Sequence, residues 1–217
     1  MADAATTAIW APRSAWAGIL DDDHIGLTGT TGVTITARDG LGIASLIAPA
    51  AGEVALTEAV KASFGLDLPT TPAIARAGAN AAVWAGPGQW LLIAESRAGF
   101  ADALQPLAGL GAVAEQSSGR AVLRLSGPRV RDALAKGCML DLHPAAFPVG
   151  MAALTSIAHI GVHLWRAEDG PEGAVFEIMV ARSFAGSFWS WLSASVAEFG
   201  CQVVMDASTG RAETGRG

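Results

Sequence analysis

The sequence is poor in charged residues, and only a few of these are basic. Asp, Glu, Lys and Arg make up 16% of the 217 residues, 51% are hydrophobic, and the formal net charge is −6. Only 14 residues are Lys or Arg, which argues against a nucleic-acid backbone as the main ligand, because phosphate binding needs clustered basic side chains. The low charge fraction fits a subunit that hides surface against partners, and it equally fits an Ala-rich coding bias.

Cysteine is scarce, and long apolar runs are missing. Cys138 and Cys201 lie far apart and form no CxxC pattern, so neither a zinc site nor a disulfide framework can be deduced from them. A reducing cytoplasm is the simpler context. The N-terminus lacks a basic region, and no apolar run reaches 18 residues. We expect a soluble cytoplasmic protein with no secretory signal and no membrane contact.

Common nucleotide and nucleophile motifs are also missing. The sequence has no GxxxxGK[ST], no GxGxxG and no GxSxG. Ser126-Gly-Pro128 precedes a helical pattern, and a helix start offers free N–H groups to a phosphate. The spacing of residues around Ser126 instead favours an ordinary tight turn between a strand and a helix. Ser126 is then the N-cap, and Gly137 takes the left-handed position that closes the helix.

What the sequence does contain is a clear alternation of strand and helix patterns. Strands are expected at 33–37, 41–47, 82–84, 89–94, 112–114, 121–125, 153–160, 162–166, 174–180 and 201–204, and helices at 53–64, 100–107, from 128, and 183–199. A hairpin with a long turn is expected around Gly86-Pro-Gly88. The order of elements repeats weakly, which predicts an α+β fold of two ferredoxin-like split β-α-β halves that share one sheet system.

This repeat sets the expected domain boundaries. Residues 1–28 have no clean period and are expected to form an N-terminal arm. Residues 29–208 form the domain, with halves at about 29–116 and 117–208, and residues 209–217 form a flexible polar tail.

Two groups of residues invite a metal interpretation. Asp21-Asp-Asp-His24 combines three carboxylates with an imidazole, but adjacent residues rarely converge on one ion, so a solvated or partner-docking segment is favoured. His159 and His163 share a face if they lie on one strand, at about 13 Å separation, which is too far for one ion. We therefore expect no metal ligands on this chain.

Three further side chains have less specific interpretations. His143 precedes Pro144 and is a turn residue or a partner contact. Trp189 and Trp191 are two positions apart on a predicted helix, so both cannot face one core. One of them is expected to face a partner or a second layer.

Residues 118–148 carry a specific resemblance. The string SGRAVLRLSGPRVRDALAKGCMLDLHPAAFP, followed in order by IGVHLW at 160–165 and FEIMVARSF at 176–184, resembles the gamma subunit of heterotetrameric sarcosine oxidase. The resemblance covers most of residues 30–200. That family is similar to the aminomethyltransferase folate-binding fold of the glycine cleavage system.

The resemblance implies a companion subunit that has no catalytic or cofactor-binding residues of its own. In such αβγδ complexes, sarcosine is oxidatively demethylated to glycine, and the one-carbon unit passes to tetrahydrofolate or leaves as formaldehyde. The expected partners are the alpha, beta and delta subunits, which carry FAD, FMN, NAD, tetrahydrofolate and zinc. Related complexes oxidise other N-methyl amino acids, so this substrate class is an alternative, as is dehydrogenase rather than oxidase chemistry.

A second hypothesis is an autonomous folate-binding protein. A pterin needs a deep pocket with a carboxylate. Asp21 to Asp23 or Glu177 are the candidates for that carboxylate.

Overall fold

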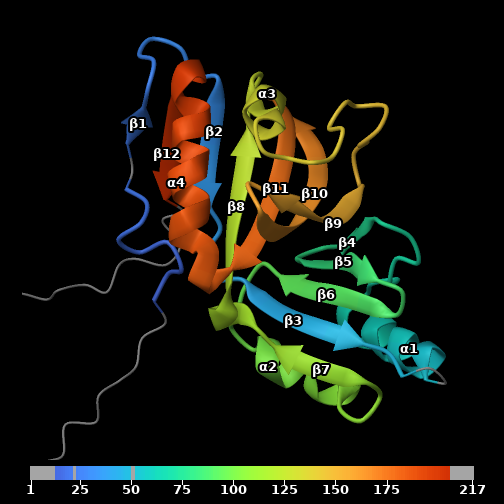
Figure 1. The fold of residues 1–217 in the computed structure, drawn as a ribbon. Coiled ribbons are helices and arrows are strands. Elements are labelled where there is room, and N and C mark those ends of the chain that lie inside the picture. Colours follow the sequence, from blue (N-terminus) through green and yellow to red (C-terminus); the bar gives the residue numbers. More distant parts are fainter. Residues whose placement is uncertain (1–12, 22, 50–51, 206–217) are drawn as a thin grey trace, which may run out of the picture.

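The protein has a mixed α+β fold with two separate β-sheets (Figure 1). The computed structural model describes residues 13–21, 23–49 and 52–205. The larger sheet has the strand order β1-β12-β2-β8-β11-β10-β9, and the smaller has the order β4-β5-β6-β3-β7. The predicted α+β class is confirmed, but the expectation of one shared sheet system is wrong.

The elements have the following bounds. The larger sheet contains β1 (His24–Ile25), β2 (Val33–Ala37), β8 (Arg120–Ser126), β9 (Ala152–Ile157), β10 (Ile160–Gly170), β11 (Gly173–Ala181) and β12 (Cys201–Met205). The smaller sheet contains β3 (Gly42–Ile47), β4 (Ile74–Ala77), β5 (Asn80–Gly86), β6 (Gln89–Ala94) and β7 (Ala112–Glu115). The α-helices are α1 (Glu53–Phe64), α2 (Phe100–Ala103), α3 (Val130–Ala135) and α4 (Ala185–Val196). The 3₁₀ helices are η1 (Gln105–Leu107), η2 (Ser117–Gly119), η3 (Arg182–Phe184) and η4 (Ala197–Phe199).

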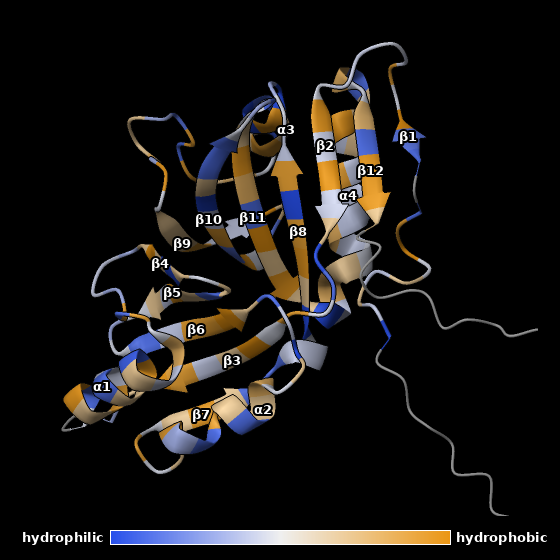
Figure 2. Ribbon diagram, turned by 180° about the vertical axis from the view of Figure 1, so that it is seen from behind, coloured by the Kyte–Doolittle hydropathy of each residue, from blue (hydrophilic) through white to orange (hydrophobic). Residues whose placement is uncertain are grey.

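Three apolar clusters give the molecule its layers. One lies between the larger sheet and helices α3 and α4, a second between the smaller sheet and helices α1 and α2, and a third between the two sheets. Adjacent side chains of β11 point to opposite faces of the larger sheet. Ile178 belongs to the cluster between this sheet and helices α3 and α4, and Met179 belongs to the cluster between the two sheets. In Figure 2, β3, β6, β8 and β11 are mostly in apolar colours, whereas the upper part of β10 is blue.

Helix α1 forms where its periodicity predicts it. Leu56, Val60 and Phe64 recur at every fourth residue and are buried against the smaller sheet. Gly65 has φ 69° and donates its N–H to the carbonyl of Lys61 at 2.9 Å, which ends the helix. Both the helix and its glycine stop are confirmed.

Helix α3 begins and ends differently from the prediction. Ser126 is the last residue of β8, and the N-cap is Arg129, with no capping side chain. Gly137 is not among the glycines with positive φ. A Cβ there would lie 2.6 Å from Cζ2 of Trp191, so glycine is needed because α4 approaches closely.

The turn between β9 and β10 also differs. Ala158 and His159 have φ 49° and 65° and form the two-residue turn, while Gly161 lies within β10. His159 and His163 therefore do not share a strand face, and that expectation is wrong. The hairpin of β5 and β6 is confirmed, but its turn is short, with two residues between the strands.

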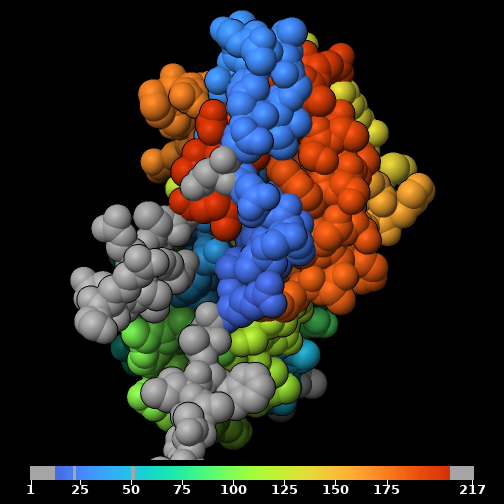
Figure 3. Space-filling view, turned by 90° about the vertical axis from the view of Figure 1, so that its left-hand side faces the viewer, coloured from blue at the N-terminus to red at the C-terminus, as the bar shows by residue number. Residues whose placement is uncertain are grey.

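The N-terminal part of the described chain packs against the larger sheet. Trp16 is fully buried, and its Nε1 donates to the carbonyl of Val122 on β8 at 3.1 Å. In the space-filling view the N-terminal residues, in blue, lie along the orange-red residues of the α4 side (Figure 3). Strand β2 follows and pairs in parallel with β12, so a strand from the first half of the sequence completes the sheet of the second half. The expectations for residues 1–12 and 209–217 lie outside the described residues.

The order of elements nevertheless recurs in the two sheets. The neighbours β4-β5-β6-β3 in one sheet match β9-β10-β11-β8 in the other. Trp90 on β6 and Ile178 on β11 both face the helices of their own sheet. The difference is that β7 pairs directly with β3, whereas β2 lies between β8 and β12.

Candidate functional site

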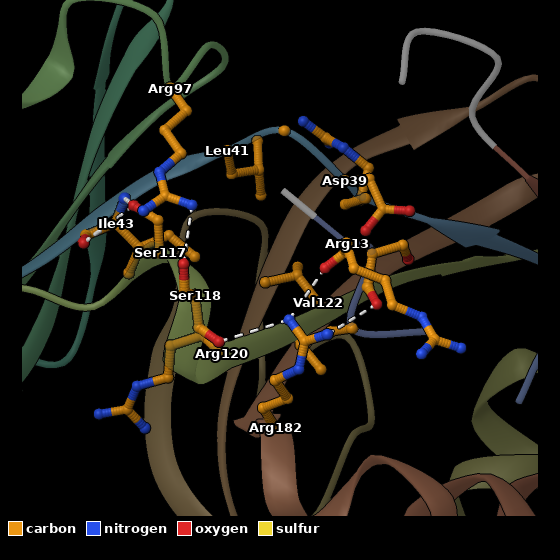
Figure 4. A pocket seen from close by; sticks show the side chains of 15 residues that line it. Arg13, Asp39, Leu41, Ile43, Arg97, Ser117, Ser118, Arg120, Val122 and Arg182 are labelled. Carbon is orange, nitrogen blue, oxygen red and sulfur yellow. Dashed lines mark hydrogen bonds between the residues drawn. The ribbon is translucent and has the colours of Figure 1, made fainter. Parts of the chain in front are cut away.

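A small pocket rich in arginine lies where the two sheets meet (Figure 4). Its volume is about 190 Å³, and its lining includes Arg13, Arg38, Arg97, Arg120 and Arg182. Cofactor pockets usually measure roughly 300–1,000 Å³. The pocket is therefore too small for a dinucleotide or a folate, and its size suits a compact group.

Separate segments bring these arginines together. Arg38 follows β2, Arg97 follows β6, Arg120 begins β8, Arg182 lies in η3, and Arg13 precedes β1. Leu41, Ile43 and Val122 are the larger apolar residues of the lining. In the close view Leu41 and Val122 lie between Arg97 and Arg13, and the guanidinium groups of Arg13 and Arg120 point away from them (Figure 4).

Two of the arginines are held by neighbouring oxygens. Arg97 donates to the hydroxyl of Ser118 at 2.8 Å and forms an ion pair with Glu115 at 3.3 Å. Arg182 donates to the carbonyls of Arg13 and Ser14 at 3.0 and 2.9 Å. These contacts fix the guanidinium groups and tie the N-terminal segment to η3.

Among the described residues, the hydrogen-bond partner of the Arg120 guanidinium is neutral. Its Nε donates to the amide oxygen of Gln116 at 2.9 Å. Burial of this half-buried guanidinium lowers the pKa of Arg120 from its ordinary value. Burial and, as a smaller cause, the positive charge of Arg120 lower the pKa of His163 to about 4. The charge of Arg120 therefore acts on a side chain of β10.

Next to the pocket lies a buried carboxylate, that of Glu177 on β11. Its Oε1 accepts from Nη2 of Arg124 at 2.5 Å and from Nη1 of Arg38 at 3.2 Å, and Nη2 of Arg76 lies 3.8 Å away. Arg38 also pairs with Glu95. Glu177 thus joins strands of both sheets, and its charge is already neutralised by arginines.

A second, wider pocket of about 510 Å³ lies between β4 and the β10–β11 turn. Its lining includes Arg76, Arg124, Glu168 and Glu172. Both arginines also contact Glu177, so charges of both signs are present and partly paired.

The structure places the predicted metal candidates apart. Asp22 lies outside the described residues, and Nε2 of His24 lies 2.7 Å from the carbonyl of Leu27. His159 occupies a turn, as described above, whereas His163 lies on β10. Within residues 13–21, 23–49 and 52–205, no group of three or more His, Cys, Asp or Glu side chains converges as metal ligands would.

The remaining predicted residues have structural roles. Nδ1 of His143 accepts from the N–H of Ala145 at 3.2 Å, which makes His143 a turn residue. Trp189 and Trp191 are both half-buried and pack against the cluster between the larger sheet and helices α3 and α4. That one of them faces a partner or a second layer stays a prediction. Both cysteines are free thiols, and burial raises the pKa of Cys201 to about 12.

Sequence reasoning missed the arginine pocket and the burial of Trp16. The five arginines come from segments spread over residues 13 to 182, and no local pattern connects them. Trp16 lies in a stretch without a period, so its burial had no local signal either.

Comparison with known proteins identifies the family. The model of the sarcosine oxidase, gamma subunit family matches residues 48–198. The chain belongs to this family. Curated gamma subunits from Corynebacterium sp. strains U-96 and P-1 are 35% and 36% identical over 145 and 157 residues. These matches cover 65% and 70% of this chain and 69% and 73% of the relatives.

Two solved structures support the fold. The heterotetrameric sarcosine oxidase from Corynebacterium sp. U-96, in complex with pyrrole 2-carboxylate, contains a chain that is 31% identical with a TM-score of 0.72. That match covers 86% of this chain and 95% of the other. The glycine cleavage system aminomethyltransferase T from Bartonella henselae, 15% identical with a TM-score of 0.58, shares the fold over 81% of this chain and 48% of its own. Among the described residues, no helix is long and apolar enough to cross a membrane.

Proposed function

We propose that this chain is the gamma subunit of a heterotetrameric sarcosine oxidase and works as a non-catalytic companion within the complex. The complex oxidatively demethylates sarcosine to glycine, and the one-carbon unit passes to tetrahydrofolate or leaves as formaldehyde. The observation that carries this proposal is the likeness to a chain of a heterotetrameric sarcosine oxidase, 95% of which is covered at 31% identity.

The partners are then the alpha, beta and delta subunits, and FAD, FMN, NAD, tetrahydrofolate and zinc belong to them. One feature of this chain supports the assignment. Several large apolar side chains remain exposed and available for subunit contacts, namely Leu27, Ile47, Val54, Met139, Val149, Leu154, Phe184 and Val204.

The environment of Glu177 argues against the autonomous folate-binding alternative. A pterin-binding carboxylate must face a cavity with its acceptor oxygens free. Glu177 is 4% exposed, and Arg38, Arg76 and Arg124 surround its Oε1. A folate site would need another carboxylate.

We also propose that the two halves of the fold are ferredoxin-like. Each sheet with its helices represents one ferredoxin-like split β-α-β unit, because the order β7-β3-β6-β5 is that of a β-α-β-β-α-β unit. The order β12-β2-β8-β11-β10 is the same arrangement with β2 inserted. We keep the domain at residues 29–208, between an arm at 1–28 and a tail at 209–217, and we assign the protein to the cytoplasm.

Co-expression tests the proposed function. The chain is expressed with and without tagged alpha, beta and delta subunits encoded in the same genome. It should co-purify in equal stoichiometry with a complex that absorbs as a flavoprotein and oxidises sarcosine, while the chain alone should be colourless and inactive. Activity with N-methylglutamate in place of sarcosine would indicate a related complex. Activity that requires artificial electron acceptors would indicate a dehydrogenase rather than an oxidase. The proposal would be overturned if the single chain is monodisperse, does not associate with these subunits and binds tetrahydrofolate.

A further inference from the structure

We infer that the outer edge of β7 is an assembly surface, where an extended, uncharged segment of a partner subunit adds one more strand to the smaller sheet. The backbone of that segment pairs with β7, and one of its apolar side chains lies in a groove beside the strand. The identity of the partner rests on the proposed function, because the occupant is a subunit of the heterotetramer.

The register of β7 shows which of its backbone groups are available. The N–H of Gln116 donates to the carbonyl of Ile43 at 2.7 Å, so residue 116 faces β3. Successive residues of a strand point their backbone groups to opposite sides, so residues 112 and 114 also face β3, whereas Val113 and Glu115 face outward. In the described part of the chain, β7 pairs with β3 alone, and no further backbone hydrogen bond involves residues 112–115.

The other sheet edges are shorter or partly covered. Strand β1 has only two residues. Strands β4 and β9 lie next to each other, because the N–H of Ile74 donates to the carbonyl of Gly150 at 2.9 Å and the N–H of Ala152 donates to the carbonyl of Pro72 at 3.2 Å. Strand β7 instead lies at the margin of the smaller sheet that is turned away from the larger sheet (Figure 1). Its edge is therefore the more accessible one for a further strand.

The features that usually protect an exposed edge are missing from β7. Its four residues, Ala-Val-Ala-Glu, include no proline and no lysine, and its register with β3 has no bulge. Ala112 and Ala114 are exposed, and Ile47, which lies opposite Ala112 on β3, is 44% exposed. An unprotected, mostly apolar edge pairs readily with another chain, so we expect it to be covered in the assembly.

A groove beside β7 can receive a side chain of the added strand. Its volume is about 390 Å³, and it lies between this strand and the segment that contains α2 and η1. Glu115 is the one ionisable residue of the lining, and it forms an ion pair with Arg97 at 3.3 Å. The groove therefore suits an uncharged, apolar side chain. The lining consists of Ala101, Leu104, Gln105, Ala108, Gly109, Gly111, Val113 and Glu115.

The size of the edge favours a partner subunit over a second copy of this chain. Four residues of strand extend over roughly 14 Å. Two copies paired through this edge alone would bury a few hundred Å², well below the roughly 1,000 Å² that a specific interface needs. A subunit that also contacts other surfaces of the chain meets that requirement. The similar chain of known structure belongs to such a hetero-oligomer, a heterotetrameric sarcosine oxidase.

A proline substitution tests the edge directly. Val113→Pro removes an outward N–H and leaves the pairing with β3 intact, because proline is tolerated at the solvent side of an edge strand. Val113→Ala is the matched control, since it also shortens the side chain but keeps the N–H. Both variants should melt at similar temperatures as single chains. With tagged alpha, beta and delta subunits, Val113→Pro should assemble about tenfold more weakly than Val113→Ala.

A second variant keeps the test decisive if Val113→Pro does not fold. Ala101 is exposed on α2 and lines the groove, so Ala101→Phe fills the groove and leaves the backbone of β7 unchanged. It should weaken assembly without lowering the Tm of the single chain. Normal assembly of Ala101→Phe would show that no partner side chain enters the groove.

Amide hydrogen exchange gives a residue-level readout. In the isolated chain the N–H groups of Val113 and Glu115 should exchange rapidly, whereas the N–H of Ala114, which faces β3, should be protected. In the complex all three should be protected. This pattern is specific to strand addition, because a partner that only covers the side chains would not protect the outward amides selectively.

The outcomes separate this inference from the proposed function. If the wild type assembles and both Val113→Pro and Ala101→Phe assemble equally well, the inference is overturned and the proposed function stands. If the outward amides are already protected in the isolated chain, the occupant is a second copy where protection falls on dilution, or the chain's own N-terminal segment where it is lost on deletion of residues 1–12. Either result overturns the inference. If the wild type does not assemble with these subunits, the proposed function fails, and the partner inferred for β7 fails with it.

Discussion

Glu177 and Arg124 lie directly opposite each other on β11 and β8, and the carboxylate of Glu177 accepts two hydrogen bonds from this guanidinium, at 3.1 and 2.5 Å. The same oxygen is shared with Arg38, from the end of β2, and lies close to Arg76 on β4. One buried carboxylate therefore connects the two sheets.

Substitution of this carboxylate should destabilise the protein strongly. Glu177→Gln keeps the shape of the side chain but leaves Arg38, Arg76 and Arg124 without their shared anion. Breaking a buried ion pair from one side costs about 3–5 kcal/mol, so the free energy of unfolding in urea should fall by about 3 kcal/mol. Asp67→Asn, which breaks a mostly exposed pair with Lys61, should change it by less than about 1 kcal/mol. Equal effects of the two substitutions would contradict this role of Glu177.

Gly137 should tolerate no side chain, although its φ is ordinary. The added Cβ of Gly137→Ala would lie 2.6 Å from Cζ2 of Trp191, and such overpacking costs roughly 1–3 kcal/mol. Gly186 in α4 is the control, because a Cβ there meets nothing within 4 Å. Gly186→Ala should stabilise the helix by roughly 0.5–1 kcal/mol. Thermal melts of the two variants should move in opposite directions, and a stabilised Gly137→Ala would refute the close approach.

His163 should make the folded state sensitive to acid. Its folded pKa is about 4, below the ordinary value of 6.5, because burial and the charge of Arg120 disfavour the cation. Below pH 6.5 the imidazole of His163 is protonated in the unfolded chain but stays neutral in the folded chain. The free energy of unfolding therefore falls as the pH drops towards 4. The free energy of unfolding falls by about 3 kcal/mol in total, because each unit of difference between the two pKa values corresponds to about 1.36 kcal/mol.

The variant His163→Gln isolates this contribution. The difference in unfolding free energy between wild type and His163→Gln should shift in favour of the variant between pH 6.5 and 4, and it should be flat above pH 7. Arg120→Gln should raise the pKa of His163 and make the loss smaller. Parallel pH profiles of wild type and His163→Gln would rule out the assignment.

Trp16 should anchor the N-terminal segment to the larger sheet. Trp16→Ala removes a fully buried indole, and such truncations cost roughly 3–5 kcal/mol. Trp16→Phe keeps most of the packing but loses the hydrogen bond to Val122, which is worth about 1 kcal/mol. Urea unfolding should therefore rank wild type, Trp16→Phe and Trp16→Ala in falling stability. Full stability of Trp16→Ala would show that this segment is not part of the core.

The sequence by itself determined helix α1 and the family. The fourfold spacing of Leu56, Val60 and Phe64 and the stop at Gly65 predicted α1 correctly, because helix periodicity and a left-handed glycine act within a few residues. The ordered string at 118–148 resembled the gamma family, and the family match over 48–198 confirms it.

Only the tertiary structure decided how these elements combine. Two separate sheets, the insertion of β2 beside β12 and the space that Trp191 requires at Gly137 all depend on residues far apart in the chain. The same holds for the candidate site, since Arg13 and Arg182 meet only because the N-terminal segment folds back onto η3. Periodicity and turn chemistry act over a few residues, whereas strand partners, close approaches and clustered charges are set by the packing of distant segments.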